Sequence, residues 1–235
     1  MNNQALSIPN EPQKFGKTKI EHVYSSLRQD ILNGKFEPGS KLRIEHIRES
    51  YGVSSSSVRE ALSRLLVENL VTTEGQRGFR VSRVSIEDFK EIAEMRKMLE
   101  SRAVYESVIR GDDEWEANLV KASHKLAKIE NLMNTDRQSS TDEWELRNND
   151  FHDALIAGCN NKWLLNFRST LYQNSIRYIR MCVEDKSSPR DVRQEHQAIF
   201  EAALERKAKL ASTLIEDHIE KSVTDLMDRL NSILK

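Results

Sequence analysis

Residues 36–82 read FEPGSKLRIEHIRESYGVSSSSVREALSRLLVENLVTTEGQRGFRVS, and this run decides the fold of the first part of the chain. Apolar residues at helical spacing predict a short helix over 43–51 and a second helix over 54–69, with a glycine between them. Residues 71–73 and 79–81 are typical of two short strands joined by a glycine-bounded hairpin. Helix, turn, helix and hairpin in this order indicate a winged helix-turn-helix.

Glycine and proline are concentrated around this run. Six of the eight glycines and three of the four prolines precede position 85. Because both residue types interrupt helices, the rest of the chain can be nearly continuous helix. Apolar spacing predicts six helices there, which favour an antiparallel bundle: 85–110, 112–134, 141–158, 161–185, 189–206 and 208–234. Asp112 and Thr141 suit helix N-caps, and Pro189 suits a first helical turn.

Charge divides the chain at the same place. Residues 1–84 carry 13 Lys+Arg against 9 Asp+Glu, a net charge of +4, whereas residues 85–235 carry 23 against 28, a net charge of −5. A basic domain joined to an acidic one makes nucleic acid a candidate partner for the first. We therefore expect a flexible arm over 1–17, a winged helix-turn-helix over 18–84, and an all-helical domain over 85–235. The fold class is mainly α with a small β-wing.

Several classes of protein are excluded by composition. No apolar run approaches the ~18 residues that a membrane span needs, and the start MNNQALSIPNEPQKFGK lacks the apolar core of a signal peptide. The chain has two cysteines, Cys159 and Cys182, which are too few for the disulfide framework of a secreted protein. A reducing cytoplasm is therefore the expected compartment.

The second helix of the pair has the two faces that DNA reading requires. One face is apolar for packing, and the other carries Ser55, Arg59 and Ser63. Arg59 can donate two hydrogen bonds to a guanine, and the serines can reach phosphates or base edges. The hairpin tip would place positive charge near a minor groove. Taken singly, each feature also fits an ordinary surface helix and hairpin.

Three histidines of the helical part fall on inward faces: His152, His196 and His218. Asn148 lies four residues before His152 on the same face. Each buried polar group needs a partner, and three imidazoles with one oxygen ligand suit Zn²⁺ or another first-row divalent ion. The alternative is that each histidine is a core residue with its own hydrogen-bond partner. His124 shares its face with lysines, and we expect it to lie in solvent.

Two arginines are candidates for binding an anion. Arg96 faces inward with Glu100. An inward guanidinium suits a carboxylate ligand, and a structural ion pair with Glu100 is an equally good alternative. Arg177 lies on a polar stripe of its helix, which could line a cavity or face water.

The run over 36–82 resembles the N-terminal domain of the GntR family of bacterial transcription regulators, through its PG, YGVS and VREAL motifs and its glycine-containing wing. The family usually has arginine where this chain has Ser55, and often a basic residue where it has Glu45, which implies an unusual operator. Family analogy and operator symmetry imply a homodimer, because two half-sites need two recognition helices. The residues expected to contact double-stranded operator DNA are Ser54, Ser55, Ser57, Arg59, Gly75, Gln76 and Arg77.

Residues 85–230 resemble the FCD sensor domain of the FadR-type branch, on the runs MRKMLESRAVYESV, NNDFHDALIAGCNN, EHQAIFEAAL and LIEDHIEKS. Metal-binding members of that branch have an Asp or Asn four residues before the first of three histidines. The resemblance therefore implies a divalent metal, with Zn²⁺ expected and Ni²⁺ or Mn²⁺ as alternatives, bound by Asn148, His152, His196 and His218. It also implies a small carboxylate effector, held by Arg96 and Arg177.

The runs GDDEWEANLVKASHKLAKIE and DEWELRNNDFHDALIAGCNN further resemble the carbon-starvation-induced regulator branch, which points to a short dicarboxylate such as glutarate. The expected function is therefore a repressor that an organic acid releases from DNA. A metal-dependent hydrolase is the alternative from another class, but the chain lacks HExxH, G-x-S-x-G and phosphate-loop motifs, so we expect no enzyme. A third interpretation is a helical dimerisation protein without a sensor site.

Overall fold

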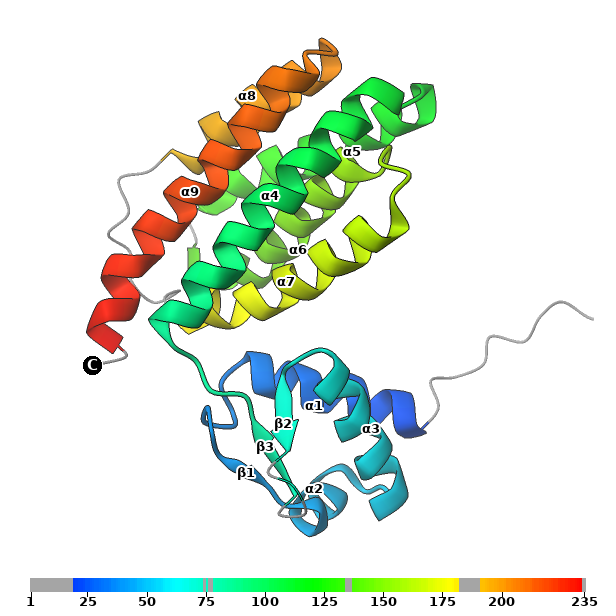
Figure 1. Ribbon diagram of the computed structural model, residues 1–235, viewed down its shortest axis with the longest axis vertical. Coiled ribbons are helices and arrows are strands. Elements are labelled where there is room, and N and C mark those ends of the chain that lie inside the picture. The colour runs from blue at the N-terminus through cyan, green and yellow to red at the C-terminus, as the bar shows by residue number, and fades with distance from the viewer. Residues whose placement is uncertain (1–18, 74, 76–77, 134–136, 182–190, 234–235) are drawn as a thin grey trace, which may run out of the picture. The chain divides into compact units, whose positions relative to one another are not determined.

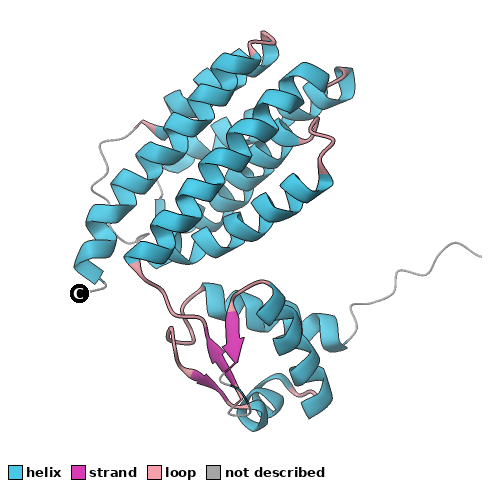
Figure 2. Cartoon of the chain, in the orientation of Figure 1, coloured by secondary structure: helices cyan, strands magenta, loops and turns pink. Residues whose placement is uncertain are grey.

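The computed structural model describes residues 19–73, 75, 78–133, 137–181 and 191–233. The contacts divide the chain into two compact units, Met1–Ser82 and Arg83–Lys235. The arm predicted over 1–17 lies outside the described residues. The first unit contains a small sheet with helices, and the second is built from helices (Figures 1 and 2).

The first unit is held together by the packing of α1 against α3. Val23 and Leu27 of α1 and Val58 and Leu65 of α3 are completely buried, which matches the apolar face predicted for the second helix of the pair. The Ser54 hydroxyl caps α3 by accepting a hydrogen bond of 3.2 Å from the Ser57 amide. The elements of this unit are α1 (Lys19–Leu32), β1 (Lys41–Leu42), α2 (Ile44–Tyr51), α3 (Ser55–Val67), β2 (Val71–Thr73) and β3 (Phe79–Val81).

The sheet has the order β1-β3-β2, and both pairs of strands are antiparallel. The predicted hairpin is confirmed, with Val71 opposite Val81. Strand β1 was not predicted, because two residues carry no periodic signal; it joins the sheet through Lys41 opposite Arg80. The helix pair α2 and α3, followed by the hairpin of β2 and β3, makes the unit a winged helix-turn-helix, as expected.

Over its described residues, the second unit contains the six expected helices, with ends within a few residues of the predicted ones. Asp112 caps α5, since its Oδ1 accepts a 2.9 Å hydrogen bond from the Trp115 amide. The predicted cap at Thr141 is wrong: Thr141 lies inside α6, within a run of Ser and Thr residues that offers several cap candidates. Pro189 lies outside the described residues. The helices are α4 (Ile86–Arg110), α5 (Asp113–Met133), α6 (Arg137–Ile156), α7 (Lys162–Met181), α8 (Val192–Leu204) and α9 (Ala208–Ile233).

The bundle packs around one main apolar cluster. Helix α4 lies beside α9 and α7, and α5 lies beside α6 (Figure 1). Ser107 of α4 and Gly158 lie in close contact at one end of the cluster, where the Gly158 amide donates a 2.8 Å hydrogen bond to the Ser107 hydroxyl. None of the described helices combines the length and the apolar character that a membrane span needs. Residues of the cluster include Val104, Leu119, Leu126, Phe151, Leu155, Ile199, Ala203 and Ile215.

Candidate metal centre and nucleic-acid interface

Three histidines meet inside the helical unit. His152 of α6, His196 of α8 and His218 of α9 are 3%, 4% and 7% exposed. Their ring centroids are 4.8–5.6 Å apart, and one nitrogen of each ring lies within 4.8 Å of the corresponding nitrogens of the other two. The inward faces assigned to these three residues from helical spacing thus converge on one point. We call these three residues the histidine cluster.

A carboxylate from another helix stands behind each histidine. Glu130 Oε1 lies 2.7 Å from Nδ1 of His196, and Glu195 Oε2 lies 2.9 Å from Nδ1 of His218. A carboxylate can only accept, so these two Nδ1 atoms donate, and each ring keeps the lone pair of Nε2 when it is neutral. Carboxylate-backed imidazoles of this kind are the usual arrangement around a protein-bound metal.

The second nitrogen of His196 lacks the partner that burial requires. Its Nε2 is inaccessible to solvent and forms no hydrogen bond with any residue that the structure describes. Because its Nδ1 is engaged with Glu130, Nε2 is the atom left to bind something within the cluster. An unpaired buried nitrogen is costly. The donor set therefore fits a divalent ion bound by imidazole nitrogens.

The third histidine is backed by a carboxylate with a larger set of partners. Nδ1 of His152 lies 3.8 Å from Oε2 of Glu100. Burial, followed by the neighbouring His218 and His196, lowers the pKa of His152 well below its usual value, so the ring is neutral at physiological pH. A neutral ring is the form that binds a metal.

Glu100 is an ionised carboxylate in the middle of the helical unit. Burial opposes its ionisation, but the guanidinium groups of Arg96 and Arg168 outweigh burial and lower the pKa of Glu100. Its Oε1 accepts a 2.8 Å hydrogen bond from Arg96 Nε and lies 3.7 Å from Arg168 Nε. Glu100 thus links the histidine cluster to two cations, the buried Arg168 and the half-buried Arg96.

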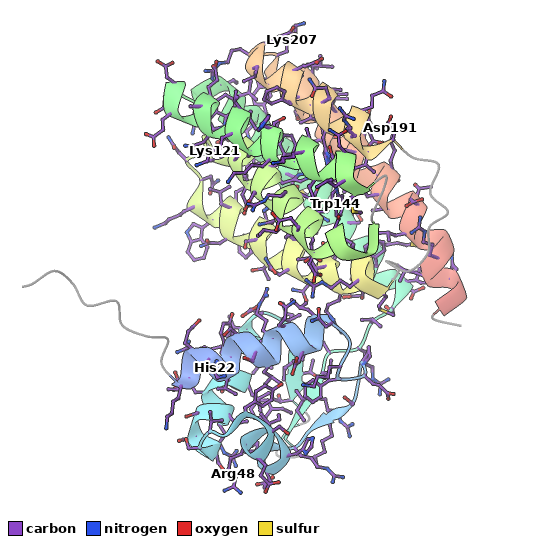
Figure 3. The ribbon with its side chains drawn as sticks, turned by 180° about the vertical axis from the view of Figure 1, so that it is seen from behind. His22, Arg48, Lys121, Trp144, Asp191 and Lys207 are labelled. Atoms are coloured by element: carbon purple, nitrogen blue, oxygen red, sulfur yellow. The ribbon has the colours of Figure 1, made fainter. Side chains whose placement is uncertain are left out.

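The remaining metal-ligand candidate, Asn148, lies one turn before His152 on α6 and is half-buried. The i, i+4 spacing places it on the same side of the helix as His152. A pocket of about 40 Å³, with room for one or two water molecules, lies between α5 and α8 and reaches Glu130 and His196. His124 is exposed on α5, as expected, close in sequence to Lys121, which lies on the surface (Figure 3).

The two arginines chosen from the sequence differ in their surroundings. Arg96 makes the ion pair with Glu100 that was the structural alternative, and its Nη1 donates a 3.0 Å hydrogen bond to the Ser175 hydroxyl. Arg177 is 6% exposed. Burial lowers the pKa of Arg177, while Tyr178 and Asp88 act in the opposite direction. Asp88 precedes Glu100 by 12 residues of α4, about 18 Å along the helix, so this acidic neighbour of Arg177 lies far along the helix from the carboxylate beside His152.

Arg168 of α7 is a buried cation that the sequence interpretation missed. It is 2% exposed, its Nη1 donates to Asp153, and its guanidinium lies over the Tyr172 ring at 4.8 Å. The spacing of apolar residues in the sequence could have revealed it, because Leu164 and Tyr172, one helical turn before and after Arg168, are both buried. An arginine between two inward residues of a helix is itself inward.

The exposed side of α3 carries one of the residues expected to contact DNA, Arg59. Arg59 is exposed, and its guanidinium forms no ion pair or hydrogen bond with the described part of the chain. Arg64, further along the same helix, is instead paired with Glu60 and Glu21. Arg59 is therefore the arginine of α3 that is available to an external partner.

The start of α3 and the wing complete this surface. Ser54 is exposed, and its hydroxyl lies 2.9 Å from that of Ser57. No acidic residue stands in the first turn of α3, which begins with Ser55, so the positive end of the helix dipole is not neutralised there. Gly75 has a φ of +53°, a conformation that favours glycine at this turn. The expected wing contacts Gln76 and Arg77 lie outside the described residues.

Both units match protein-family models. Residues 19–81 match the gntR family of bacterial regulatory proteins, and residues 91–221 match the FCD domain. The chain is 39% identical over 208 residues to the HTH-type transcriptional regulator BphR of Paraburkholderia xenovorans, covering 88% of this chain and 85% of that protein. It is 35% identical over 200 residues to the HTH-type transcriptional repressor GlaR of Escherichia coli, covering 83% of this chain and 90% of that protein.

Solved structures show the same fold. The chain superposes on E. coli McbR/YncC with a TM-score of 0.70 at 21% identity, covering 90% of this chain and 98% of the other. At this level of identity the similarity establishes the arrangement of helices and strands. The matched proteins are transcription regulators rather than enzymes, so the hydrolase alternative is excluded.

Proposed function

The chain belongs to the GntR family of bacterial regulatory proteins and carries an FCD domain, and from this premise we propose that it is a metal-containing repressor controlled by a small organic acid. The family makes it a transcription regulator. The name of the E. coli relative, a transcriptional repressor, supports the sign of the regulation. Because bacterial operator DNA lies in the cytoplasm, the protein acts there.

DNA is read by α3 and the wing in this proposal. Arg59 contacts a base edge, and Ser54, Ser55 and Ser57 contact phosphate or bases near the start of α3. Gly75, Gln76 and Arg77 form the wing contact. The observation that supports this assignment is the guanidinium of Arg59, which is exposed and has no partner among the described residues. Two half-sites of a symmetric operator require a homodimer.

A divalent ion is held by His152, His196 and His218, with Asn148 as the fourth ligand. Zn²⁺ is the first candidate, with Ni²⁺ and Mn²⁺ as alternatives. A bound ion would supply positive charge and open coordination positions for a carboxylate. Glu130 and Glu195 orient the rings from behind, and the unpaired Nε2 of His196 is the single observation that carries this part of the proposal.

The effector is a small carboxylate, such as the dicarboxylate glutarate, that binds beside the metal. Arg96 contributes positive charge on α4, the helix that directly follows the DNA-binding unit in the chain. Arg177, the other arginine chosen from the sequence, is a weaker candidate because Asp88 is its charged neighbour. To act as an inducer, the acid must bind more tightly to the arrangement that releases DNA than to the arrangement that binds it.

DNA binding is tested by anisotropy on an operator selected from a random duplex library. Arg59→Ala should weaken binding roughly tenfold to a hundredfold, as expected when a bidentate base contact worth about 1–3 kcal/mol is lost. Arg64→Ala is the matched control on the same helix, because Arg64 is already paired with two glutamates. Equal affinities of wild type and Arg59→Ala would contradict the assignment.

Metal binding is tested by elemental analysis of the purified protein. Wild type should carry about one equivalent of metal for each chain, His196→Ala much less, and His124→Ala, which alters an exposed histidine, as much as wild type. Equal metal content in wild type and His196→Ala would refute the site. Absence of both metal and any thermal shift with mono- and dicarboxylates would favour a helical dimerisation protein without a sensor.

A further inference from the structure

Arg168 has an unused pair of hydrogen-bond donors. Its Nε and Nη2 are both inaccessible to solvent and donate no hydrogen bond to any of the residues described. These two N–H groups point the same way from the planar guanidinium, and together they form the edge that binds a carboxylate in a bidentate manner. Nη1, on the other side, is occupied by Asp153.

The nearest acidic group does not fill this edge. Glu100 Oε1 lies 3.7 Å from Arg168 Nε, beyond hydrogen-bond distance, and the same oxygen accepts the 2.8 Å bond from Arg96. Arg96 is committed in turn to Glu100 and Ser175. Of the two guanidinium groups beside Glu100, Arg168 is therefore the one with an open bidentate edge.

The position of Arg168 connects this edge to the histidine cluster. Arg168 approaches one oxygen of Glu100, and His152 lies 3.8 Å from the other. Arg168 Nε and His152 Nδ1 thus lie beside the two oxygens of the same carboxylate, that of Glu100. A ligand that touches both needs only a few atoms between its two ends, which indicates a short organic acid.

We infer that Arg168 binds a carboxylate of the effector through Nε and Nη2. This inference rests on the acid sensor proposed above and names the residue that recognises the acid. Buried donors without acceptors destabilise the ligand-free site, and an incoming planar carboxylate removes that penalty. Because the edge is closed to solvent, binding requires a more open arrangement of the helices. Glu100 stays with Arg96 and maintains the charge balance around the ligand.

Calorimetric titration of the zinc-loaded, full-length protein with glutarate tests this inference. Arg168→Lys keeps the charge but loses the paired donors, so it should bind glutarate roughly tenfold to a hundredfold more weakly. Arg147→Lys is the matched control, because Arg147 of α6 pairs with Glu143 and Asp150 in a more exposed position. Zinc content should be equal in all three proteins, since a guanidinium donates and does not ligate the metal.

A second variant guards against misfolding of the lysine variant. Arg168→Met fills a similar volume with an apolar side chain and removes the unpaired donors, so it should fold with unchanged zinc content and still lose glutarate binding. 1,5-Pentanediol, which lacks carboxylates, should not bind wild type. Circular dichroism and thermal unfolding establish that each variant is folded.

The outcomes separate this inference from the function on which it rests. Glutarate affinity equal in wild type and in a folded Arg168 variant would overturn the inference and would leave the acid sensor intact. Wild-type binding of inorganic phosphate but of neither glutarate nor butyrate would overturn the assignment to a planar carboxylate. Wild-type binding of none of these anions would refute the acid sensor itself.

Discussion

The hydrogen bond between His196 and Glu130 gives the sharpest test of how the metal site is organised. Glu130→Gln keeps the size of the side chain and an oxygen acceptor but removes the negative charge behind the ring. The Nδ1–Oε1 distance is 2.7 Å, and the His196 and Glu130 side chains are only 4% and 7% exposed. Solvent therefore screens this charge-assisted bond only weakly.

The expected loss follows from the difference between two kinds of hydrogen bond. A bond to a charged group contributes about 1.5–3 kcal/mol and a neutral one about 0.5–1.5 kcal/mol, so the substitution removes roughly 1–1.5 kcal/mol. A bound cation polarises the imidazole and makes Nδ1–H a stronger donor, so this loss falls mainly on the metal-bound state. Zinc affinity should fall about tenfold, because tenfold corresponds to about 1.4 kcal/mol.

A competitive titration against a chromophoric zinc chelator measures this change. Glu201→Gln is the matched control, because Glu201 is an exposed residue of α8 whose carboxylate accepts from Gln197. Unfolding in the presence of EDTA should give similar stabilities for wild type and Glu130→Gln, since the glutamine can still accept from Nδ1. A zinc affinity of Glu130→Gln within twofold of wild type would refute the role given to Glu130.

Three further perturbations address metal linkage, packing and helix capping. Zinc at a hundred times its Kd should stabilise the protein by about 2.7 kcal/mol and raise Tm by roughly 5–10 °C in calorimetry; EDTA should reverse the shift, and a similar shift in His218→Ala would contradict the site. Gly158→Ala should cost about 1–3 kcal/mol in urea unfolding, because the added Cβ would lie 2.8 Å from the Ser107 carbonyl oxygen; an unchanged midpoint would mean that the helices can separate there. Asp112→Ala should cost about 1 kcal/mol in the same assay, with Asp112→Asn near wild type, because the Trp115 amide loses its cap; equal losses in both variants would contradict a capping role.

Helical periodicity in the sequence was sufficient to find the inward histidines and the six helices of the second unit. Periodicity within one helix fixes which side faces the core, and His152, His196 and His218 each had apolar neighbours on that side. The absence of helix-breaking residues over long stretches fixed the extent of the helices. Both signals are local, which is why they could be read from a single chain.

The partners of the histidines could not be predicted in the same way. Glu130 and Glu195 are acidic residues in polar helices. Each meets its histidine ring only because two packed helices have a particular shift along their axes. This axial shift depends on how the side chains of the two helices interlock, and a single sequence carries no local signal for it. Arg168 was missed for a different reason, because a long charged side chain in a helix is usually assigned to the surface.

Two neighbouring residues of helix α8 are paired with two different helices, which makes the length of this helix critical. Glu195 and His196 are adjacent, yet Glu195 accepts from His218 of α9 while His196 donates to Glu130 of α5. One added residue between His196 and Ile199 would turn both side chains by about 100° relative to the buried face that Ile199 anchors. Such a change in length would break both pairs at once, whereas substitutions on the exposed side would leave them intact. We therefore expect this segment to tolerate changes in its surface residues but not in its number of residues.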